Sequence, residues 1–435
     1  MRYDPAPAAL FIRNRERLAQ LLPTGTMVVI HANDIYPTNA DGVMPFKQNS
    51  NLYYLSGIDQ EDTVLILFPD AADAKDRAIL FVRETTEHLR VWEGEKLTIE
   101  QASSLSGIGS VKLTSAFDGE LNRLAFQAKT LFLETNEHPR ADAVTQTRND
   151  RFVAECKQRF PLHDYGRLAP LITELRAIKQ PEEIDMMRQA IAISKAGYER
   201  VLKFIRPGVG EWEIEAEFQH EFLRARSRGF AYTPIVASGA NALCLHYIEN
   251  NQRCQDGDLI LMDIGAEWGN WNADLTRTVP VNGRFTPRQR AVYDAVLRVF
   301  KYADSVLRPG IQLKDYTRLV YDRMAEELVG LALLTTEDLK QRTADMPLAK
   351  DPVRKYFMHG VSHHLGLDVH DVSPTDGVVA EGMVFTIEPG IYITEEGLGI
   401  RLENNFLVGK DGNTDLCADV PLEAEEIEAC ILQSS

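Results

Sequence analysis

The chain has 435 residues, of which 44% are hydrophobic and 26% are charged, and this length predicts two domains. Its formal net charge of −17 argues against nucleic acid as a partner, because binding to phosphates depends on cationic side chains that release counterions. No apolar run approaches the roughly 18 residues that a membrane helix requires, so no membrane span is expected.

The N-terminal residues and the cysteines bear on the cellular compartment. Residues 1–18 carry prolines and charges where a secretory signal has its apolar core, so we predict no targeting segment and a cytoplasmic location. The five cysteines are an odd number, are widely spaced and include no CxxC pair. This pattern disfavours both a disulfide framework and a thiolate zinc site.

The first half of the chain alternates strand-like apolar runs with helical stretches. Runs such as TMVVIHA, TVLILFP, RAILFV and TLFLE, separated by turn signals, predict an α/β domain with a mixed sheet. Further on, Pro181 followed by three acids is typical of a helix start, because proline fits the first turn and acids favour the positive end of the helix dipole. We place a boundary near residue 172, which gives domains of residues 1–172 and 173–435.

The second half contains an internal repeat. RPG turns at 206–208 and 308–310 each end a helical pattern and lie 102 residues apart. DGDLILMDIG at 256–265 matches EGMVFTIEPG at 381–390 in its acids, glycines and apolar core, with an offset of 125. Two matches in the same order favour duplication over chance. The polar segment 335–356 is about as long as the difference between the two offsets, and we interpret it as an insertion into the second copy.

Carboxylates at strand ends indicate a binding site. Asp263 and Glu388 occupy equivalent places in the two copies, and a buried unpaired charge costs on the order of several kcal/mol. A second acid follows each of them, Asp274 and Glu403, so four acids are expected to converge at the pseudo-twofold axis of the duplicated unit. Most single acids are turn residues or surface ion-pair partners. Four in matched hairpins, with histidines between them, favour a site for a hard divalent ion such as Mn²⁺.

The stretch MHGVSHHLGLDVHD at 358–371 holds four of the ten histidines. His359 and His363 are four residues apart, as in a zinc peptidase helix, but the HExxH motif is absent and nearby glycines disfavour a helix. A serine hydrolase built on Ser362 or Ser238 is also disfavoured, because neither serine lies in a GxSxG motif.

The motifs MHGVSHHLGLDVHD, MDIGAEWGNWNADLTRT, TIEPGIY and GIRLEN, in this order and spacing, resemble those of the aminopeptidase P and prolidase family. The resemblance covers most of residues 175–430. In the first half, NADGVMPFKQNSNLYYLSGIDQEDTVLIL resembles the aminopeptidase P type of N-terminal domain. It implies an α/β (α+β) fold in which an N-terminal mixed-sheet domain precedes a C-terminal pita-bread domain with an internal pseudo-twofold duplication.

The resemblance also implies the ligands of two divalent metal ions, with Mn²⁺ preferred and Zn²⁺ or Co²⁺ as alternatives: Asp263, Asp274, His363, Glu388 and Glu403. Glu388 would in addition carry a proton to the leaving nitrogen. His370 would contact the scissile carbonyl, whereas His359 and His246 would line the cleft and assist substrate placement or proton transfer.

Further residues are implied to bind the substrate. Arg401 and Tyr392 match pocket residues of the family, and Trp92 matches an aromatic residue that bounds the proline pocket. Asp41 matches an acid of the N-terminal domain that reaches a neighbouring subunit's site. His364 stands where relatives often have an aromatic residue, and it has no assigned role.

The implied activity is that of a metallo-exopeptidase that hydrolyses the N-terminal Xaa-Pro bond of peptides, through a hydroxide that bridges the two metals. The expected partner is a peptide with proline at its second position. A homo-oligomer, either dimer or tetramer, is expected because Asp41 and Trp92 serve a site only if subunits associate. Two alternatives are a prolidase that cleaves Xaa-Pro dipeptides and a non-catalytic pita-bread binding module, which the presence of all five ligand positions disfavours.

Overall fold

The computed structural model describes residues 2–141, 144–343 and 346–433. The chain forms two compact units, one of residues 5–176 and one that begins at Ala177 and includes the N-terminal segment up to Asp4. The boundary predicted near residue 172 lies within helix α7 (Ala169–Ala177). Among the residues that the structure describes, every helix is too short or too polar to cross a membrane.

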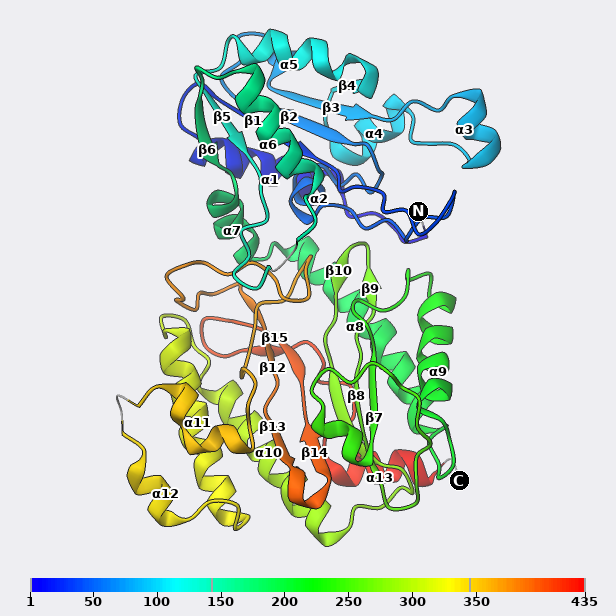
Figure 1. The fold of residues 1–435 in the computed structure, drawn as a ribbon, viewed down its shortest axis with the longest axis vertical. Helices are drawn as coiled ribbons and strands as arrows, with labels where there is room; N and C mark the ends of the chain where they lie inside the picture. Colours follow the sequence, from blue (N-terminus) through cyan, green and yellow to red (C-terminus); the bar gives the residue numbers. More distant parts are fainter. Residues whose placement is uncertain (1, 142–143, 344–345, 434–435) are drawn as a thin grey trace. The chain divides into compact units, whose positions relative to one another are not determined.

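The unit of residues 5–176 is built on a six-stranded mixed sheet in the order β4-β3-β2-β1-β5-β6 (Figure 1). β1 pairs antiparallel with β2 and parallel with β5, and β3 pairs parallel with β4. All six residues of β1 are buried, which agrees with the apolar run TMVVIH. The strands are β1 (Thr26–His31), β2 (Val64–Leu67), β3 (Ala78–Val82), β4 (Ser110–Leu113), β5 (Thr130–Leu133) and β6 (Asp164–Arg167).

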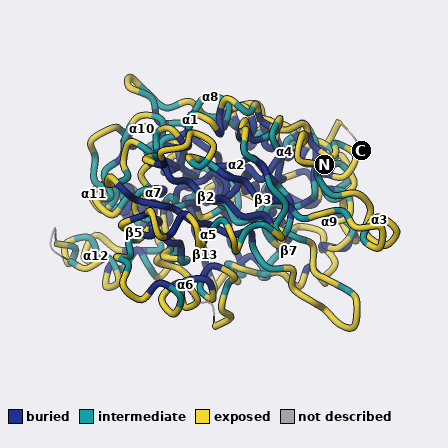
Figure 2. Tube along the Cα trace, turned by 90° about the horizontal axis from the view of Figure 1, so that it is seen from above, coloured by how far each residue is buried: buried dark blue, intermediate teal, exposed yellow. Residues whose placement is uncertain are grey.

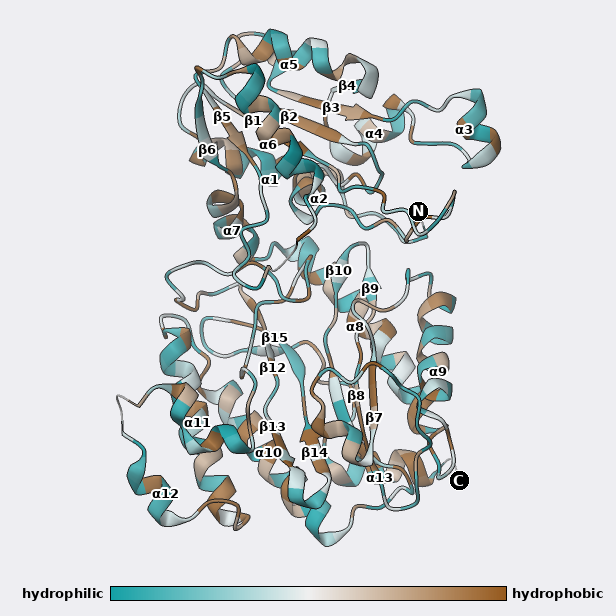
Figure 3. Cartoon of the chain, in the orientation of Figure 1, coloured by the Kyte–Doolittle hydropathy of each residue, from teal (hydrophilic) through white to brown (hydrophobic). Residues whose placement is uncertain are grey.

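Helices complete the core of this unit. α5 (Phe117–Ala125) and α6 (Arg148–Arg159) pack on one sheet face, against alternate strand residues such as Met27 and Val29. α1 (Ala8–Leu21), α2 (Ser50–Ser56) and α4 (Ile99–Ser106) form a second packed group. Figure 3 shows β2 and β3 of this sheet as hydrophobic ribbons. Since side chains alternate along a strand, a central strand covered on both faces is apolar throughout.

Two exposed elements of this unit carry residues that the sequence predicts to bind the substrate. A hairpin holds Asp41, which is exposed, and is closed by hydrogen bonds from the Met44 N–H to the Tyr36 carbonyl oxygen and from the Thr38 N–H to the Gly42 carbonyl oxygen. The short helix α3 (Glu87–Trp92) contributes no buried residue, and Trp92 at its end is 76% exposed. Figure 2 shows α3 as mostly exposed chain.

In the second unit, the first copy of the repeat consists of a helix pair and an antiparallel sheet. α8 (Pro181–Leu202) begins at the predicted proline with a capping box formed by Gln180 and Glu183, and α9 (Glu211–Arg224) follows the first RPG turn. The sheet has the order β11-β8-β7, with β7 (Ile235–Ser238), β8 (Leu259–Asp263) and β11 (Thr276–Pro280). The small hairpin of β9 (Glu267–Trp268) and β10 (Trp271–Asn272) connects β8 to β11.

The second copy repeats this plan. α10 (Pro287–Val306) and α11 (Leu313–Gly330) flank the second RPG turn, and β12 (Val384–Ile387) pairs antiparallel with β15 (Asn404–Leu407). The hairpin of β13 (Gly390–Ile393) and β14 (Leu398–Arg401) lies between them in sequence. β16 (Thr414–Asp415) pairs with β15, and α13 (Ala424–Leu432) closes the described chain. Figure 1 shows α8 and α9 beside β7 and β8, and α10 and α11 on the side of β12.

Backbone pairing extends the repeat to individual positions. Ile235 of β7 lies opposite Asp263 at the end of β8. In the second copy, the carbonyl of Val361 accepts a hydrogen bond of 2.9 Å from the N–H of Glu388. Residues 361–364 therefore run beside β12 as β7 runs beside β8. The histidine stretch occupies the place of a strand of the first copy, not of a helix.

The segment 335–356 is extra chain in the second copy. Only ten residues, 225–234, connect α9 to β7, whereas 331–360 connect α11 to the equivalent segment. The additional residues form α12 (Thr336–Gln341) and two 3₁₀ turns, Leu348–Lys350 and Pro352–Lys355. This arrangement agrees with the insertion inferred from the two offsets.

Candidate metal centre

Four carboxylates from the two copies lie at strand ends. Asp263 is the last residue of β8 and Glu388 directly follows β12. Asp274 precedes β11 by two residues, and Glu403 immediately precedes β15. The matched hairpins thus place all four acids where their strands leave the sheet, as the sequence predicts.

Tyr232 links two of these acids. Its hydroxyl lies 2.6 Å from Oδ1 of Asp263 and 2.6 Å from Oδ1 of Asp274. A phenol has one hydrogen and donates to one acceptor at a time. The second close approach therefore requires either a proton on that carboxyl group or a cation that neutralises it.

Arg401 supplies a buried positive charge at the same place. One of its terminal nitrogens donates to Oδ2 of Asp263 at 2.6 Å, and the other donates to the Tyr392 hydroxyl at 2.8 Å. Glu403 accepts a hydrogen bond of 2.7 Å from the Thr276 hydroxyl. One guanidinium cannot balance four carboxylates, so the cluster carries excess negative charge when all four are ionised.

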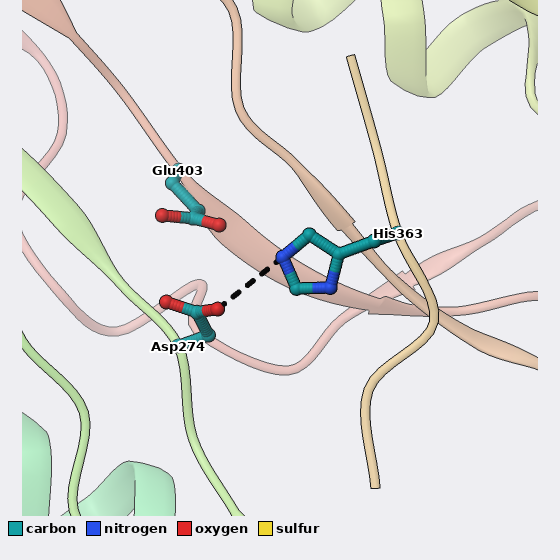
Figure 4. Close-up of side chains that lie close together, drawn as sticks. All are labelled: Asp274, His363 and Glu403. Carbon is teal, nitrogen blue, oxygen red and sulfur yellow. Dashed lines mark ion pairs between the residues drawn. The ribbon is translucent and has the colours of Figure 1, made fainter. Parts of the chain in front are cut away.

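His363 brings an imidazole to the carboxylates (Figure 4). Its Nδ1 lies 2.9 Å from the carbonyl oxygen of His364, which can only accept, so Nδ1 carries the hydrogen. Nε2 then faces Oδ2 of Asp274 at 3.4 Å and Oε1 of Glu388 at 3.8 Å. Donor atoms of Asp274, His363 and Glu403 all lie within 4.8 Å of one another.

Burial and mutual repulsion raise the pKa values of Asp274, Glu388 and Glu403. Burial is the largest cause for each of these three, and it raises the pKa of Glu388 to about 7. The pKa of Glu403 is raised well above its usual value by burial and then by the charges of Asp274, Asp263 and Glu388. Burial also raises the pKa of Asp274. A group of acids that resists ionisation in this way is stabilised in its charged form by a bound cation.

These donors fit a divalent metal site. Carboxylate oxygens with a single imidazole suit hard or borderline divalent ions. In the tautomer of His363 that carries its hydrogen on Nδ1, Nε2 has the lone pair that a metal ligand needs. The five predicted ligand residues are brought together by strand ends of both copies. No thiolate contributes to the cluster among the described residues.

A chain of hydrogen bonds joins Arg401 to His359. Tyr392 accepts from Arg401, and its hydroxyl lies 2.8 Å from Nε2 of His359. Nδ1 of His359 lies 2.8 Å from the carbonyl oxygen of Gly360 and 3.5 Å from Oε2 of Glu388. Burial, and next the charge of Arg401, lower the pKa of His359 to about 3, so the ring is neutral.

The remaining predicted site residues are placed as follows. The ring of His370 lies edge-on to that of His363, with 4.3 Å between centroids. His246 is exposed on the segment that follows β7, and its charge contributes to the lowered pKa of His359. Asp41 and Trp92 belong to the unit of residues 5–176, and their roles stay predictions.

Two family models match the chain. The model of metallopeptidase family M24 matches residues 185–410, which contain all five clustered donors. The chain belongs to metallopeptidase family M24. A second model, the N-terminal domain of aminopeptidase P, matches residues 11–132.

Named relatives of this M24 chain agree with both matches. The Xaa-Pro aminopeptidase of Escherichia coli (strain K12) is 33% identical, over 97% of each chain. The structure of zinc-substituted E. coli aminopeptidase P in complex with product has a TM-score of 0.87 and 32% identity, and covers 99% of this chain and 100% of that one. The same enzyme with the inhibitor Pro-Leu has a TM-score of 0.85 and 32% identity, and covers 99% of both chains. The predicted fold class and the predicted class of metallo-exopeptidase are thereby confirmed.

Sequence reasoning missed two residues of the M24 site. Tyr232 bridges two acids and Thr276 bonds a third, yet neither was selected as a candidate. Thr276 stands two residues after Asp274 in the motif NADLTRT, where alternation along a strand puts both side chains on one side. Tyr232 lies in a loop before β7, where no periodicity identifies it.

Proposed function

We propose that this chain is an Xaa-Pro aminopeptidase that depends on two divalent metal ions, preferably Mn²⁺, and removes the first residue from peptides with proline second. The convergence of four carboxylates and one imidazole from both copies carries the proposal. The names of the relatives supply the substrate class.

Asp263, Asp274, His363, Glu388 and Glu403 would hold the metals. Bound divalent ions of this kind lower the pKa of water and polarise a carbonyl group. The oxygen-rich donor set favours Mn²⁺, with Zn²⁺ and Co²⁺ as alternatives. The free α-amino group of a peptide would lie near a metal and acidic residues, which would restrict cleavage to the first bond.

Glu388 is the proposed proton carrier. The nitrogen of a proline peptide bond bears no hydrogen, so it must acquire a proton to leave as an amine. A carboxylate beside the reacting bond can accept a proton and donate it to that nitrogen. Burial already favours the protonated form of Glu388, because it raises the pKa of this residue to about 7 in the metal-free protein. Oε2 of Glu388 lies 3.5 Å from Nδ1 of His359, whose ring is neutral.

The histidines and Arg401 orient the substrate in this proposal. His370, whose ring touches that of His363, would contact the scissile carbonyl, and His246 and His359 would line the cleft. Arg401 balances the charge of Asp263 and holds Tyr392, which in turn fixes the ring of His359. Hydrogen bonds that fix a ring before the substrate arrives reduce the reorganisation needed during the reaction.

The test compares metal-free and Mn²⁺-loaded protein on an Xaa-Pro-Yaa tripeptide and an Xaa-Pro dipeptide. We expect chelation to abolish tripeptide cleavage and Mn²⁺ to restore it. Asp274→Ala should reduce kcat by at least about 10³-fold, because it removes a ligand. Cleavage of the dipeptide alone would assign a prolidase. Metal binding without hydrolysis would indicate a binding module, and turnover that survives complete metal removal would overturn the proposal.

The domains have separate proposed roles. Residues 173–435 would form the catalytic domain and residues 1–172 an aminopeptidase P type N-terminal domain, as the family matches support. The N-terminal unit exposes Val43 and Met44 by 56% each, Val91 by 75% and Trp92 by 76%. Large apolar side chains gathered on exposed elements are typical of an interaction surface.

We propose on this basis that the protein is a homo-oligomer in which Asp41 and Trp92 serve a neighbouring subunit's site. Sedimentation of the wild-type chain and of Trp92→Ala tests it, with a lower oligomer mass and a lower kcat/KM expected for the variant. A wild-type monomer with full activity would contradict it. The five free cysteines support the proposed cytoplasmic location.

A further inference from the structure

We infer that Lys179 and Asp371 form a positioning pair for His363 and His370, a role that rests on the proposed metal site. Nζ of Lys179 donates to Oδ2 of Asp371 at 3.0 Å, and each side chain is only 1% exposed. The two residues are 192 positions apart in sequence. Separating a pair so deeply buried is costly, because each charge would lose its direct ion-pair partner away from water.

The pair acts on His363 through a single carbonyl oxygen. The N–H of Asp371 donates to the carbonyl oxygen of His364 at 2.9 Å. The same oxygen accepts the Nδ1–H of His363 at 2.9 Å. Fixing Asp371 therefore fixes the acceptor that sets both the tautomer and the ring orientation of His363. The same hydrogen bond between Asp371 and His364 also holds His370, the residue before Asp371, with its ring against that of His363.

Lys179 lies where the first copy of the repeat meets the second. The next residue, Gln180, begins the capping box of α8 in the first copy, and the N–H of Lys179 donates to the carbonyl oxygen of Gly382 in the second copy at 2.9 Å. Lys179 thus connects the start of α8 to the histidine loop of the second copy. The ion pair ties the histidine loop to the start of α8, a rigid helix. Without it, the position of the loop would depend on local contacts.

Gly366 shows how closely the loop is fitted around this pair. A Cβ atom added there would lie 2.3 Å from Oδ2 of Asp371 and 3.0 Å from Cε of Lys179. The backbone N–H and the side-chain amide of Asn272 both donate to the Gly366 carbonyl oxygen, at 3.0 and 2.9 Å. The loop is held on both sides, and only glycine leaves room for the ion pair.

These contacts also indicate a structural role for His364. Its ring is buried and packs on Phe385, with 4.2 Å between ring centroids, while burial lowers its pKa to about 3. The side chain is a neutral packing group, and the backbone carbonyl is the junction between Asp371 and His363. His364 therefore supports the site through its backbone carbonyl oxygen and its packing on Phe385.

The experiment removes both charges together in the full-length double variant Lys179→Met/Asp371→Asn, so that neither charge of the pair is left without the other. We measure Mn²⁺ affinity of the metal-free protein by calorimetry, and kcat and KM on an Xaa-Pro-Yaa tripeptide. Loss of an outer residue that orients a metal ligand lowers metal affinity or activity about 10- to 100-fold. We expect Mn²⁺ affinity and kcat to fall in this range, with KM changed less than about threefold.

Two further variants separate positioning from general stability. Arg298→Met/Glu327→Gln removes an ion pair of 2.6 Å between α10 and α11 and should leave Mn²⁺ affinity and kcat unchanged. Gly366→Ala keeps both charges but displaces Asp371, so it should lower Mn²⁺ affinity in the same direction. Wild-type Mn²⁺ affinity in both Lys179→Met/Asp371→Asn and Gly366→Ala would overturn the inference.

The Nδ1–H signal of His363 in histidine-labelled protein distinguishes this inference from the proposed function. If wild-type protein binds no Mn²⁺, the proposed function fails, but the signal still reports on the ring. Its loss in the double variant supports positioning, and its retention contradicts positioning.

Discussion

Thr276 and Glu403 face each other in an antiparallel bridge. The N–H of each donates to the carbonyl oxygen of the other, at 3.4 and 3.1 Å, and the Thr276 hydroxyl donates to the Glu403 carboxylate at 2.7 Å. The register of β8 with β11 and of β12 with β15 makes these two residues equivalent in the two copies. The local axis of the duplication therefore passes between them.

The Thr276 hydroxyl supports the buried carboxylate of Glu403. Thr276→Val removes a donor at almost constant volume, so we expect the free energy of unfolding to fall by about 1–3 kcal/mol. Mn²⁺ affinity should fall by about tenfold, since outer hydrogen bonds orient ligands. Thr278→Val is the matched control, because it removes a hydroxyl that donates to the Arg401 carbonyl oxygen and accepts from the Arg401 N–H. It should affect stability alone, and equal losses of Mn²⁺ affinity in both variants would refute the specific role.

Metal binding should release protons near neutral pH. Burial raises the pKa of Glu388 to about 7, so the metal-free protein carries a proton there at pH 6.5 that a bound cation displaces. We expect about one or more protons released per chain at pH 6.5 and fewer at pH 8.5. Calorimetric titration with Mn²⁺ in two non-coordinating buffers of different ionisation enthalpy measures the number. A binding enthalpy that is independent of the buffer at pH 6.5 would exclude this coupling.

Glu211 organises the segment that carries His246. The carboxylate is fully buried and accepts five hydrogen bonds, from Ser238 N–H and Oγ, Asn241, Tyr247 and Gln252. Glu211→Gln places an amide group against some of these donors, so we expect a loss of about 1–3 kcal/mol in stability. If His246 contacts the substrate, kcat/KM should fall about tenfold, as in His246→Ala. A destabilised variant with wild-type kcat/KM would restrict Glu211 to stability.

His31 should make the protein sensitive to acid. Burial, with a smaller contribution from Arg148, lowers its pKa from 6.5 to about 3. Below pH 6.5 the unfolded chain binds a proton that the folded chain does not, so the free energy of unfolding falls as the pH drops toward 3. The expected loss between pH 7 and pH 5 is about 2 kcal/mol.

The variant His31→Phe tests this, because His31 already packs on the rings of Phe117 and Phe152. Chemical denaturation at pH 7 and pH 5 should show a smaller loss in the variant than in the wild-type chain. Identical pH dependence of the two proteins would show that His31 does not contribute.

The sequence predicts the acids and histidines of the site because they lie in short motifs at strand ends, where burial of a charge is itself informative. It also predicts the repeat, since offsets between turns survive divergence. The same patterns do not predict which residues lie opposite one another across the sheets. The register equates Asp274 with Arg401 and Thr276 with Glu403, although the order of acids along the sequence suggests a match of Asp274 with Glu403.

Other residues of the site are not predicted from the sequence because their roles depend on contacts between distant segments. Lys179 meets Asp371 only after both copies have folded together, and nothing in the local sequence of Lys179 marks it as a partner of the histidine loop. Tyr232 is similar, because its role follows from the positions of two strand ends and not from its own segment.

The duplication also bears on how such a site arises. A half-length ancestor with one helix pair and one strand hairpin would hold a single acid of the Asp263 and Glu388 type, with the remaining donors outside its own chain. Two identical chains related by a twofold axis would have brought two such acids together. In a single chain each half can change alone, and Ala237 and His363, which occupy equivalent positions, are different residues. The asymmetry of the present site is a property that no symmetric dimer of the ancestor could have had.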